Sequence, residues 1–128
     1  MHSVFFDHFA ITVRDLEISR TFYLDILGLS PVDRPDFSFP GAWFSIGNSV
    51  QLHLIQDGNA ALPISGSRAL HFAFRTSEIY RFRDHLIKQK IPFVKDIKSR
   101  PDGILHLFIK DPDGYFIEII SDPDQSED

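Results

Sequence analysis

The sequence predicts an α+β fold made of two tandem βαβββ modules, and a repeated segment carries the prediction. The segment "DHFAITV" at 7–13 returns as "LHFAFRT" at 70–76, with the His-Phe-Ala triplets 63 residues apart. Both copies are followed by a helical pattern and then by short β-like runs, which indicates a duplication. A half of about 60 residues is small for an independent core, so we expect both halves to form one domain.

The first half begins with an alternating strand pattern, "FAITV", at 9–13. Asp15 is placed to cap the following helix, and Gly28 is placed to end it. Two further strands are expected at 42–46 and 50–55, on either side of the turn "GNS".

The second half repeats this order. "HFAFRT" at 71–76 predicts a strand, Ser77 is the expected helix cap, and Pro92 closes the helical segment. The turn "DPDG" between two apolar runs predicts a hairpin near the end. The strands expected in this half lie at 92–97, 104–109 and 115–120.

The predicted domain covers 1–128 in four parts. Module 1 is 1–56 and module 2 is 69–122. Between them, 57–68 has the Gly, Pro and Ser content of a linker, and 123–128 is an acidic tail.

Composition excludes several classes of protein. The chain has no cysteine, so any metal must be bound by nitrogen or oxygen. The formal net charge is −5, and four acids lie in the last eight residues, so no basic surface for nucleic acid is expected. No leader or membrane-spanning apolar run is apparent, and we therefore predict a soluble cytoplasmic protein that binds neither membrane nor nucleic acid.

Histidines and a carboxylate occupy equivalent strand positions of the two halves. His8 and His71 open the repeated strands, and Glu118 lies on the last strand of the second half. Aligning "HLIQD" with "EIISD" matches His53 to Glu118, whereas aligning the turn glycines matches Gln51 to it. Because Gln51 and His53 share one strand face, either is a candidate fourth group.

These groups predict a metal site. A carboxylate within "YFIEII" needs compensating charge or hydrogen bonds. Imidazoles and carboxylates are ordinary ligands of zinc, nickel, iron, cobalt and manganese. Each histidine alone could be a hydrogen-bonded core residue, and Glu118 alone could pair with Arg75. The equivalent placement of all four groups in the repeat favours a divalent transition metal.

The chain resembles the vicinal oxygen chelate superfamily, from "DHFAITVRDLEISRTFYLDILGL" to "FIKDPDGYFIEII". This superfamily includes glyoxalase I, methylmalonyl-CoA epimerase, extradiol dioxygenases, fosfomycin-resistance proteins and bleomycin-binding proteins. The segment "KDPDGYFIEI" is most similar to the end of glyoxalase I, which suggests a glyoxalase I-like member.

The resemblance implies a cupped mixed sheet around a central cavity that holds a divalent metal. His8, His71 and Glu118 match its ligand positions. At the fourth position glyoxalase I has glutamate and the epimerase has glutamine, whereas here His53 is the candidate and Gln51 lies two residues away. The resemblance alone also suggests a homodimer.

The first functional hypothesis is a metal-dependent lyase or isomerase that stabilises an enediolate on a small oxygen-chelating substrate. Glu118 would be a ligand and also the base, and Gln51 would hydrogen-bond the substrate. The segments 34–43 and 98–103 would form a lid, unless they are simple turns packed on the core. The lid residues expected to contact substrate are Phe37, Phe39, Trp43 and Arg100.

Two alternatives stay open. Without His53, two histidines and one glutamate would suit a ferrous extradiol-type dioxygenase. A nonenzymatic protein that binds a small molecule such as an antibiotic is the third hypothesis.

Overall fold

The computed structural model describes residues 3–59 and 70–122. The chain divides into two compact units, Met1–Leu62 and Pro63–Asp128, and each is described by itself. The predicted acidic tail and most of the predicted linker lie outside the described residues. No helix in the described part of the chain is long and apolar enough to span a membrane.

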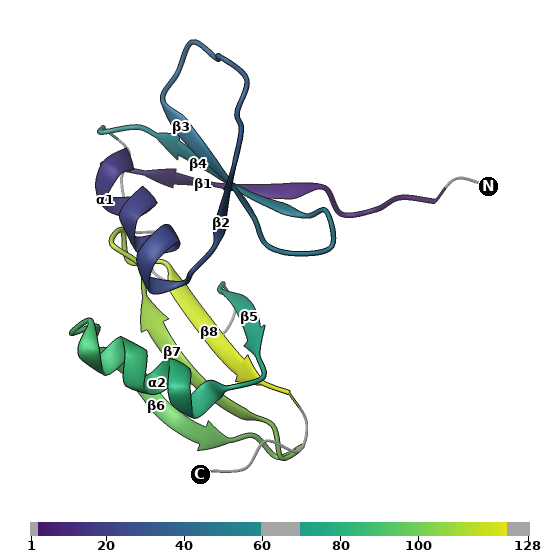
Figure 1. The fold of residues 1–128 in the computed structure, drawn as a ribbon, viewed down its shortest axis with the longest axis vertical. Helices are drawn as coiled ribbons and strands as arrows, with labels where there is room; N and C mark the ends of the chain where they lie inside the picture. Colours follow the sequence, from purple (N-terminus) through teal and green to yellow (C-terminus); the bar gives the residue numbers. More distant parts are fainter. Residues whose placement is uncertain (1–2, 60–69, 123–128) are drawn as a thin grey trace. The chain divides into compact units, whose positions relative to one another are not determined.

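The first unit contains one four-stranded mixed sheet and one helical segment (Figure 1). The strand order is β1-β4-β3-β2, with β1 and β4 parallel and the other neighbours antiparallel. The helix α1 continues directly into a π-helical turn, η1. The elements are β1 (His8–Val13), α1 (Leu16–Thr21), η1 (Phe22–Ile26), β2 (Ser30–Val32), β3 (Gly41–Ser45) and β4 (Gln51–Gln56).

The second unit repeats this topology with the strand order β5-β8-β7-β6. Here β5 and β8 are parallel, and the other neighbours are antiparallel. The predicted α+β fold of two βαβββ modules is confirmed, since both units place their strands in the same order. The elements are β5 (Phe72–Thr76), α2 (Ile79–Lys88), β6 (Phe93–Ser99), β7 (Leu105–Lys110) and β8 (Phe116–Ser121).

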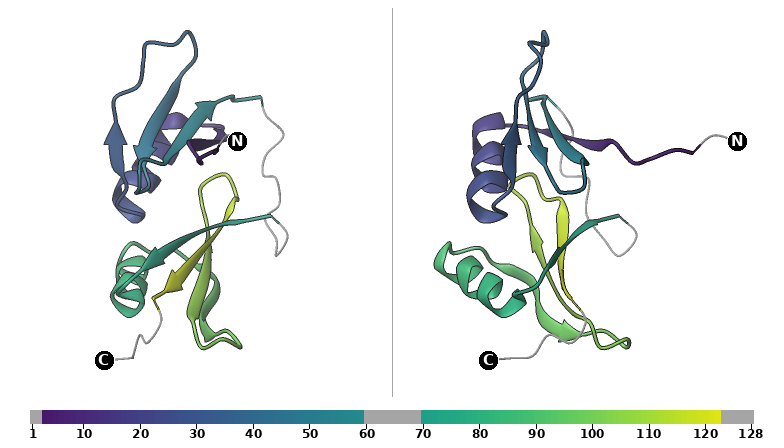
Figure 2. Two further views of the ribbon diagram at one scale, coloured as in Figure 1. Left: turned by 90° about the vertical axis from the view of Figure 1, so that its right-hand side faces the viewer. Right: turned by 45° about the vertical axis from the view of Figure 1, so that its right-hand side comes forward.

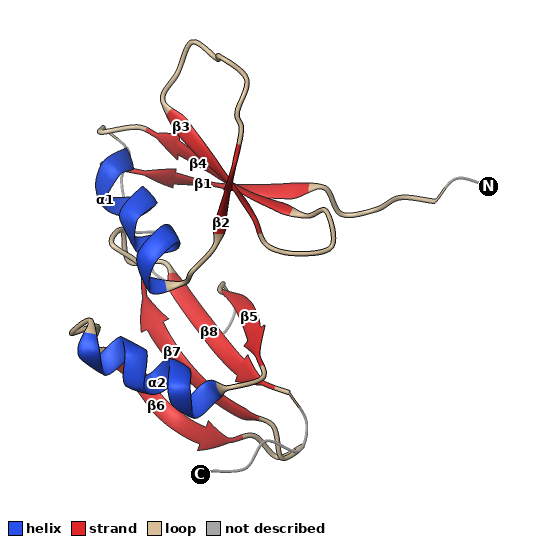
Figure 3. Ribbon diagram, viewed as in Figure 1, coloured by secondary structure: helices blue, strands red, loops and turns tan. Residues whose placement is uncertain are grey.

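In each unit the helical segment covers one face of the sheet and leaves the other face uncovered by a helix of that unit (Figures 2 and 3). α1 contacts β3 and β4, and α2 contacts β8. Alternation along the strands sends large apolar side chains to the helix side, where their burial drives folding. The buried side chains are Ile11, Val13, Phe22, Tyr23, Phe44, Leu52 and Leu54 in the first unit, and Ile79, Leu86, Leu107, Ile109, Ile117 and Ile119 in the second.

Local sequence signals explain most element ends. Asp15 caps α1 as predicted, because its side chain accepts a hydrogen bond from the Ile18 N–H at 3.2 Å. The prediction for Ser77 is wrong: Glu78 is the N-cap of α2, and the Thr76 hydroxyl accepts from its N–H at 3.1 Å. Thr76, one position before Ser77, therefore supplies the side-chain acceptor at the start of α2. The short strand β2, which contains Pro31, had no alternating pattern to reveal it.

The "DPDG" turn between β7 and β8 is organised by a buried carboxylate. Asp111 is 5% exposed, and its Oδ1 accepts hydrogen bonds from the N–H groups of Asp113 and Tyr115, each at 2.9 Å. The Gly114 N–H donates to the Asp111 carbonyl at 3.0 Å, with Gly114 at φ 92°. This turn fixes the start of β8 and therefore the position of Glu118.

We predict that Asp111→Ala lowers the free energy of unfolding by about 3 kcal/mol, because two N–H groups lose a buried acceptor. Asp111→Asn retains an acceptor oxygen and should lose about 1 kcal/mol. Urea unfolding followed by circular dichroism measures both. Asp57→Ala is the matched control: its Oδ1 accepts from the Asn59 N–H at 3.0 Å in an exposed turn, where water can replace it. Equal losses for the two alanine variants would contradict this account.

Candidate functional site

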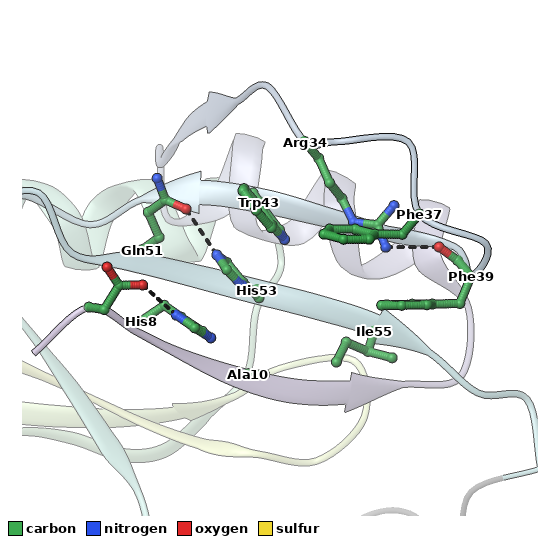
Figure 4. Close-up of a pocket in the computed structure, with 10 residues that line it drawn as sticks. His8, Ala10, Arg34, Phe37, Phe39, Trp43, Gln51, His53 and Ile55 are labelled. Carbon is green, nitrogen blue, oxygen red and sulfur yellow. Dashed lines mark hydrogen bonds and ion pairs between the residues drawn. The ribbon is translucent and has the colours of Figure 1, made fainter.

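The polar face of the first sheet forms a cavity of about 520 Å³. Alternation and register bring β1, β3 and β4 side chains to this face, since Trp43 pairs with His53 and His53 pairs with Ala10. The loop between β2 and β3 extends beyond the strands (Figure 1) and completes the wall. The lining residues are Asp7, His8, Ala10, Arg34, Phe37, Phe39, Trp43, Gln51, His53 and Ile55 (Figure 4).

Three rings are stacked in this cavity. His53 lies between His8 and Trp43, with ring centroids 4.0 Å apart on both sides. The Asp7 carboxylate accepts a hydrogen bond from His8 Nδ1 at 2.6 Å, so a bond from His8 to a metal would use Nε2. His53 Nε2 donates to Gln51 Oε1 at 2.9 Å (Figure 4), which leaves the lone pair on Nδ1. Each imidazole therefore has one nitrogen fixed by a partner and one able to act as a ligand.

The surroundings of His53 favour its neutral form. Burial lowers the pKa of its imidazole below the usual value, and the nearby His8 lowers the pKa further. Asp7 acts in the opposite direction, and Arg34 adds a smaller lowering effect. A neutral imidazole can bind a metal or accept a proton without first losing one.

The register of the two sheets decides which residue of the first module matches Glu118. Ala10 on β1 lies opposite His53 on β4, and Ala73 on β5 lies opposite Glu118 on β8. Because Ala10 and Ala73 are equivalent in the repeat, His53 and Glu118 are equivalent too. Gln51 lies opposite His8, one pleat further along the same face.

In the second module Glu118 is held between two histidines. Its Oε1 accepts from His71 Nε2 at 3.1 Å, and its Oε2 accepts from His106 Nδ1 at 2.8 Å. The Glu118 side chain is 11% exposed, whereas the His71 and His106 side chains are 25% and 21% exposed. The two hydrogen bonds compensate the buried carboxylate, as its apolar strand requires. These three residues line a cavity of about 290 Å³ together with Val94, Lys95, Phe108 and Phe116.

The separation of His71 and Glu118 fits two ligands of one divalent metal. Two ligand atoms bound at about 2.1 Å to one ion lie roughly 3.0–3.4 Å apart at tetrahedral or octahedral angles. The 3.1 Å between His71 Nε2 and Glu118 Oε1 falls in that range. No group of three or more His, Asp or Glu side chains among residues 3–59 and 70–122 is arranged as a metal centre. The predicted ligands are divided between the modules, His8 and His53 in the first and His71 and Glu118 in the second.

The residues predicted to contact substrate have different surroundings. Phe37 and Trp43 line the cavity of the first module, with ring centroids 5.9 Å apart. Arg100 lies between β6 and β7, where its Nε and Nη2 donate to the two carboxylate oxygens of Asp102. This pairing raises the pKa of Arg100 and lowers the pKa of Asp102. The side chains that line the cavity of the second module do not include Arg100.

Asp7, His106 and Arg34 line these cavities but were not among the site residues predicted from the sequence. Asp7 directly precedes His8, and a carboxylate beside a candidate ligand is a signal that could have been used. His106 lies in an alternating strand, but alternation alone does not show that it reaches Glu118. Arg34 lies in an irregular loop, for which the sequence has no periodic signal.

Comparison with known proteins identifies the family of this chain. The sequence model of the Glyoxalase/Bleomycin resistance protein/Dioxygenase superfamily matches residues 5–119. The chain belongs to this superfamily. The resemblance to glyoxalases and their relatives predicted from the sequence is thereby confirmed, and so is the vicinal oxygen chelate fold.

Relatives within the superfamily cover nearly the whole chain. A Bacillus subtilis protein, "Uncharacterized protein YwbC", is 32% identical over 120 residues, which are 88% of this chain and 93% of the relative. "Glyoxylase I 4" of Arabidopsis thaliana is 29% identical over 126 residues, 93% of this chain and 71% of the relative. The crystal structure of a glyoxalase/dioxygenase from Nostoc punctiforme is 26% identical, with a TM-score of 0.79 over 97% of this chain and 99% of the other.

Proposed function

We propose that this superfamily member is a divalent-metal-dependent lyase or isomerase of the glyoxalase type, with His8, His53, His71 and Glu118 as metal ligands. The observation that supports it best is the register, which makes His53 and Glu118 equivalent just as His8 and His71 are equivalent. Each module thus contributes a pair of ligands of matched position. By resemblance to the superfamily, we also expect a cytoplasmic homodimer acting on a small molecule.

A bound divalent ion would act as a Lewis acid that stabilises negative charge on two adjacent substrate oxygens while a neighbouring C–H proton leaves. The chain's own residues position the groups around that reaction. Asp7 fixes the tautomer of His8 so that Nε2 faces outward as a base or ligand. Gln51 fixes His53 in the same way through Nε2.

Glu118 is the residue that we assign to proton transfer. Its two oxygens have different partners, His71 on Oε1 and His106 on Oε2. The hydrogen bond from His106 holds the carboxylate in place while Oε1 serves as the ligand or accepts the substrate proton. The cavity beside it is lined by Phe108 and Phe116, whose rings would limit the access of water to the Glu118 carboxylate.

Metal analysis of protein purified without chelator tests the proposal. We expect about one transition-metal ion per chain and loss of that ion in His8→Ala and His71→Ala. His85→Ala, on the surface helix α2, is the matched control and should keep the metal. Substoichiometric metal in the parent protein, unchanged by either ligand substitution, would refute the metal-dependent function.

A ferrous extradiol-type dioxygenase is the second candidate, and one observation favours it. His53 Nε2 is already hydrogen-bonded to Gln51, and its ring is stacked on both sides. A ligand set without His53 leaves two histidines and one glutamate, the facial arrangement of ferrous oxygenases. Unchanged metal affinity in His53→Ala, together with colour formation from catechol under ferrous iron and oxygen, would favour this candidate over the lyase or isomerase.

A further inference from the structure

Arg34 is a cation without a carboxylate partner among the described residues. Its Nη2 donates to the Phe39 carbonyl at 2.8 Å, and its guanidinium carbon lies 4.9 Å from the ring centroids of both Phe37 and Phe39. Four other arginines are ion-paired: Arg75 with Asp122, Arg81 with Glu78, Arg83 with Asp96 and Arg100 with Asp102. The guanidinium has five N–H donors, so most remain available for a planar anion.

The Arg34 side chain lines the cavity and packs against Gly41 at the start of β3. A Cβ atom at Gly41 would lie 3.0 Å from the Arg34 guanidinium carbon and Nε, and 2.5 Å from the Leu54 carbonyl oxygen. The Leu54 carbonyl oxygen therefore requires glycine at this position, and the Arg34 guanidinium packs against that glycine. The guanidinium is held by this packing, by one hydrogen bond and by two aromatic rings, which reduces the entropy lost when it binds a ligand.

The neighbouring wall of the cavity is aromatic and open. Phe37 and Phe39 are each 43% exposed, and their rings are stacked with centroids 5.5 Å apart at an interplanar angle of 12°. Trp43 continues this wall toward His53. Figure 4 shows Arg34, Phe37 and Phe39 grouped at one end of the cavity, with Gln51 and His8 at the other. A flat apolar body covering these rings would remove apolar surface from water and stack favourably.

We propose that Arg34 is an anion-binding residue of the substrate site, and that the substrate class is a small organic acid with a flat aromatic body. The carboxylate binds the free N–H groups of Arg34, and the aromatic body lies along Phe37, Phe39 and Trp43. The reacting end then lies beside His8 and His53, so the assignment rests on the proposed function. Arg34 takes the substrate-contacting role expected of Arg100, whose guanidinium is bound to Asp102.

Binding of four simple probes tests the assignment: phenylacetate, the neutral phenylacetamide, the saturated cyclohexylacetate, and phenyl phosphate. Trp43 is the only tryptophan of the chain, so quenching of intrinsic fluorescence reports occupancy of this cavity, and calorimetry provides the dissociation constant. We expect phenylacetate to bind most tightly, and Arg34→Gln to weaken its binding about tenfold or more. Phenylacetamide should bind Arg34→Gln and the parent protein equally.

Controls separate this result from misfolding and from the metal proposal. Arg34→Lys keeps the charge but loses the planar fork, and it should weaken phenylacetate binding by about threefold. Arg81→Gln removes an exposed, ion-paired arginine of the second module and should have no effect. Each measurement is made with the protein as purified and after chelation, and the metal content of Arg34→Gln is measured separately. Absence of bound metal from the parent protein would refute only the proposed function, because phenylacetate binding through Arg34 does not require the ion.

Three outcomes would overturn the assignment. Unchanged phenylacetate binding in a folded Arg34→Gln would remove Arg34 from the site. Equal affinity for cyclohexylacetate would remove the aromatic requirement. Tighter binding of phenyl phosphate than of phenylacetate would refute the carboxylate class and replace it with a phosphate ester.

Discussion

Glu118→Gln is expected to lower the affinity for a divalent transition metal roughly 100-fold or more. The substitution keeps the size and shape of the side chain, but removes the negative charge that faces His71 Nε2 at 3.1 Å. An amide oxygen is a much weaker ligand for zinc, cobalt or nickel than a carboxylate. Isothermal titration with cobalt measures the dissociation constant directly.

Thermal unfolding with and without metal gives a second, independent readout of the same prediction. A metal that binds only the folded state raises the midpoint of unfolding according to its affinity, so Glu118→Gln should lose most of that rise. Glu78→Gln is the matched control, because Glu78 is an exposed acid paired with Arg81 at 2.8 Å. If Glu118→Gln and the parent protein bound cobalt with dissociation constants within about threefold, Glu118 would not be a ligand.

Much of the fold could be predicted because alternation is a strong signal in this sequence. The strands β1, β4 and β5 largely alternate large apolar residues with small or polar ones, and β8 is an apolar run that contains Glu118. These patterns predicted the strands and the faces that carry His8 and Glu118. The strand β2 was not predicted, because its three residues include a proline and are too few to show an alternating pattern. The helix cap at Glu78 differed by one residue from the expected Ser77, since Thr76 supplies the local hydrogen bond.

For the candidate site, the sequence predicted only which strand face each residue lies on. Alternation placed Gln51 and His53 on one face but could not choose between them, because the choice depends on the register of β1 with β4. The pairing of side chains across strands, such as His106 with Glu118, depends on their rotamers. The periodicity of a sequence does not specify rotamers. Arg34 comes from the loop between β2 and β3, where the conformation is set by packing on Gly41 and the phenylalanines.

His106→Leu is expected to weaken metal binding by about 10- to 100-fold, although His106 is not assigned as a ligand. Its Nδ1 donates to Glu118 Oε2 at 2.8 Å, and this bond fixes the orientation in which Oε1 faces His71. Without the donor, the carboxylate can rotate and keeps only one of its two compensating hydrogen bonds. Cobalt titration measures the loss, and His85→Leu on α2 is the matched control.

His106→Asn distinguishes a positioning residue from a ligand. The asparagine amide can place an N–H near the position of His106 Nδ1, so a positioning role predicts that this variant recovers most of the lost affinity. The absorption spectrum of the cobalt-loaded protein should then match that of the parent, because the coordinating atoms are unchanged. A folded His106→Leu with parental affinity would show that Glu118 is oriented by its strand alone. An altered cobalt spectrum in His106→Asn, together with a cobalt affinity as low as that of His106→Leu, would instead indicate that His106 is itself a ligand.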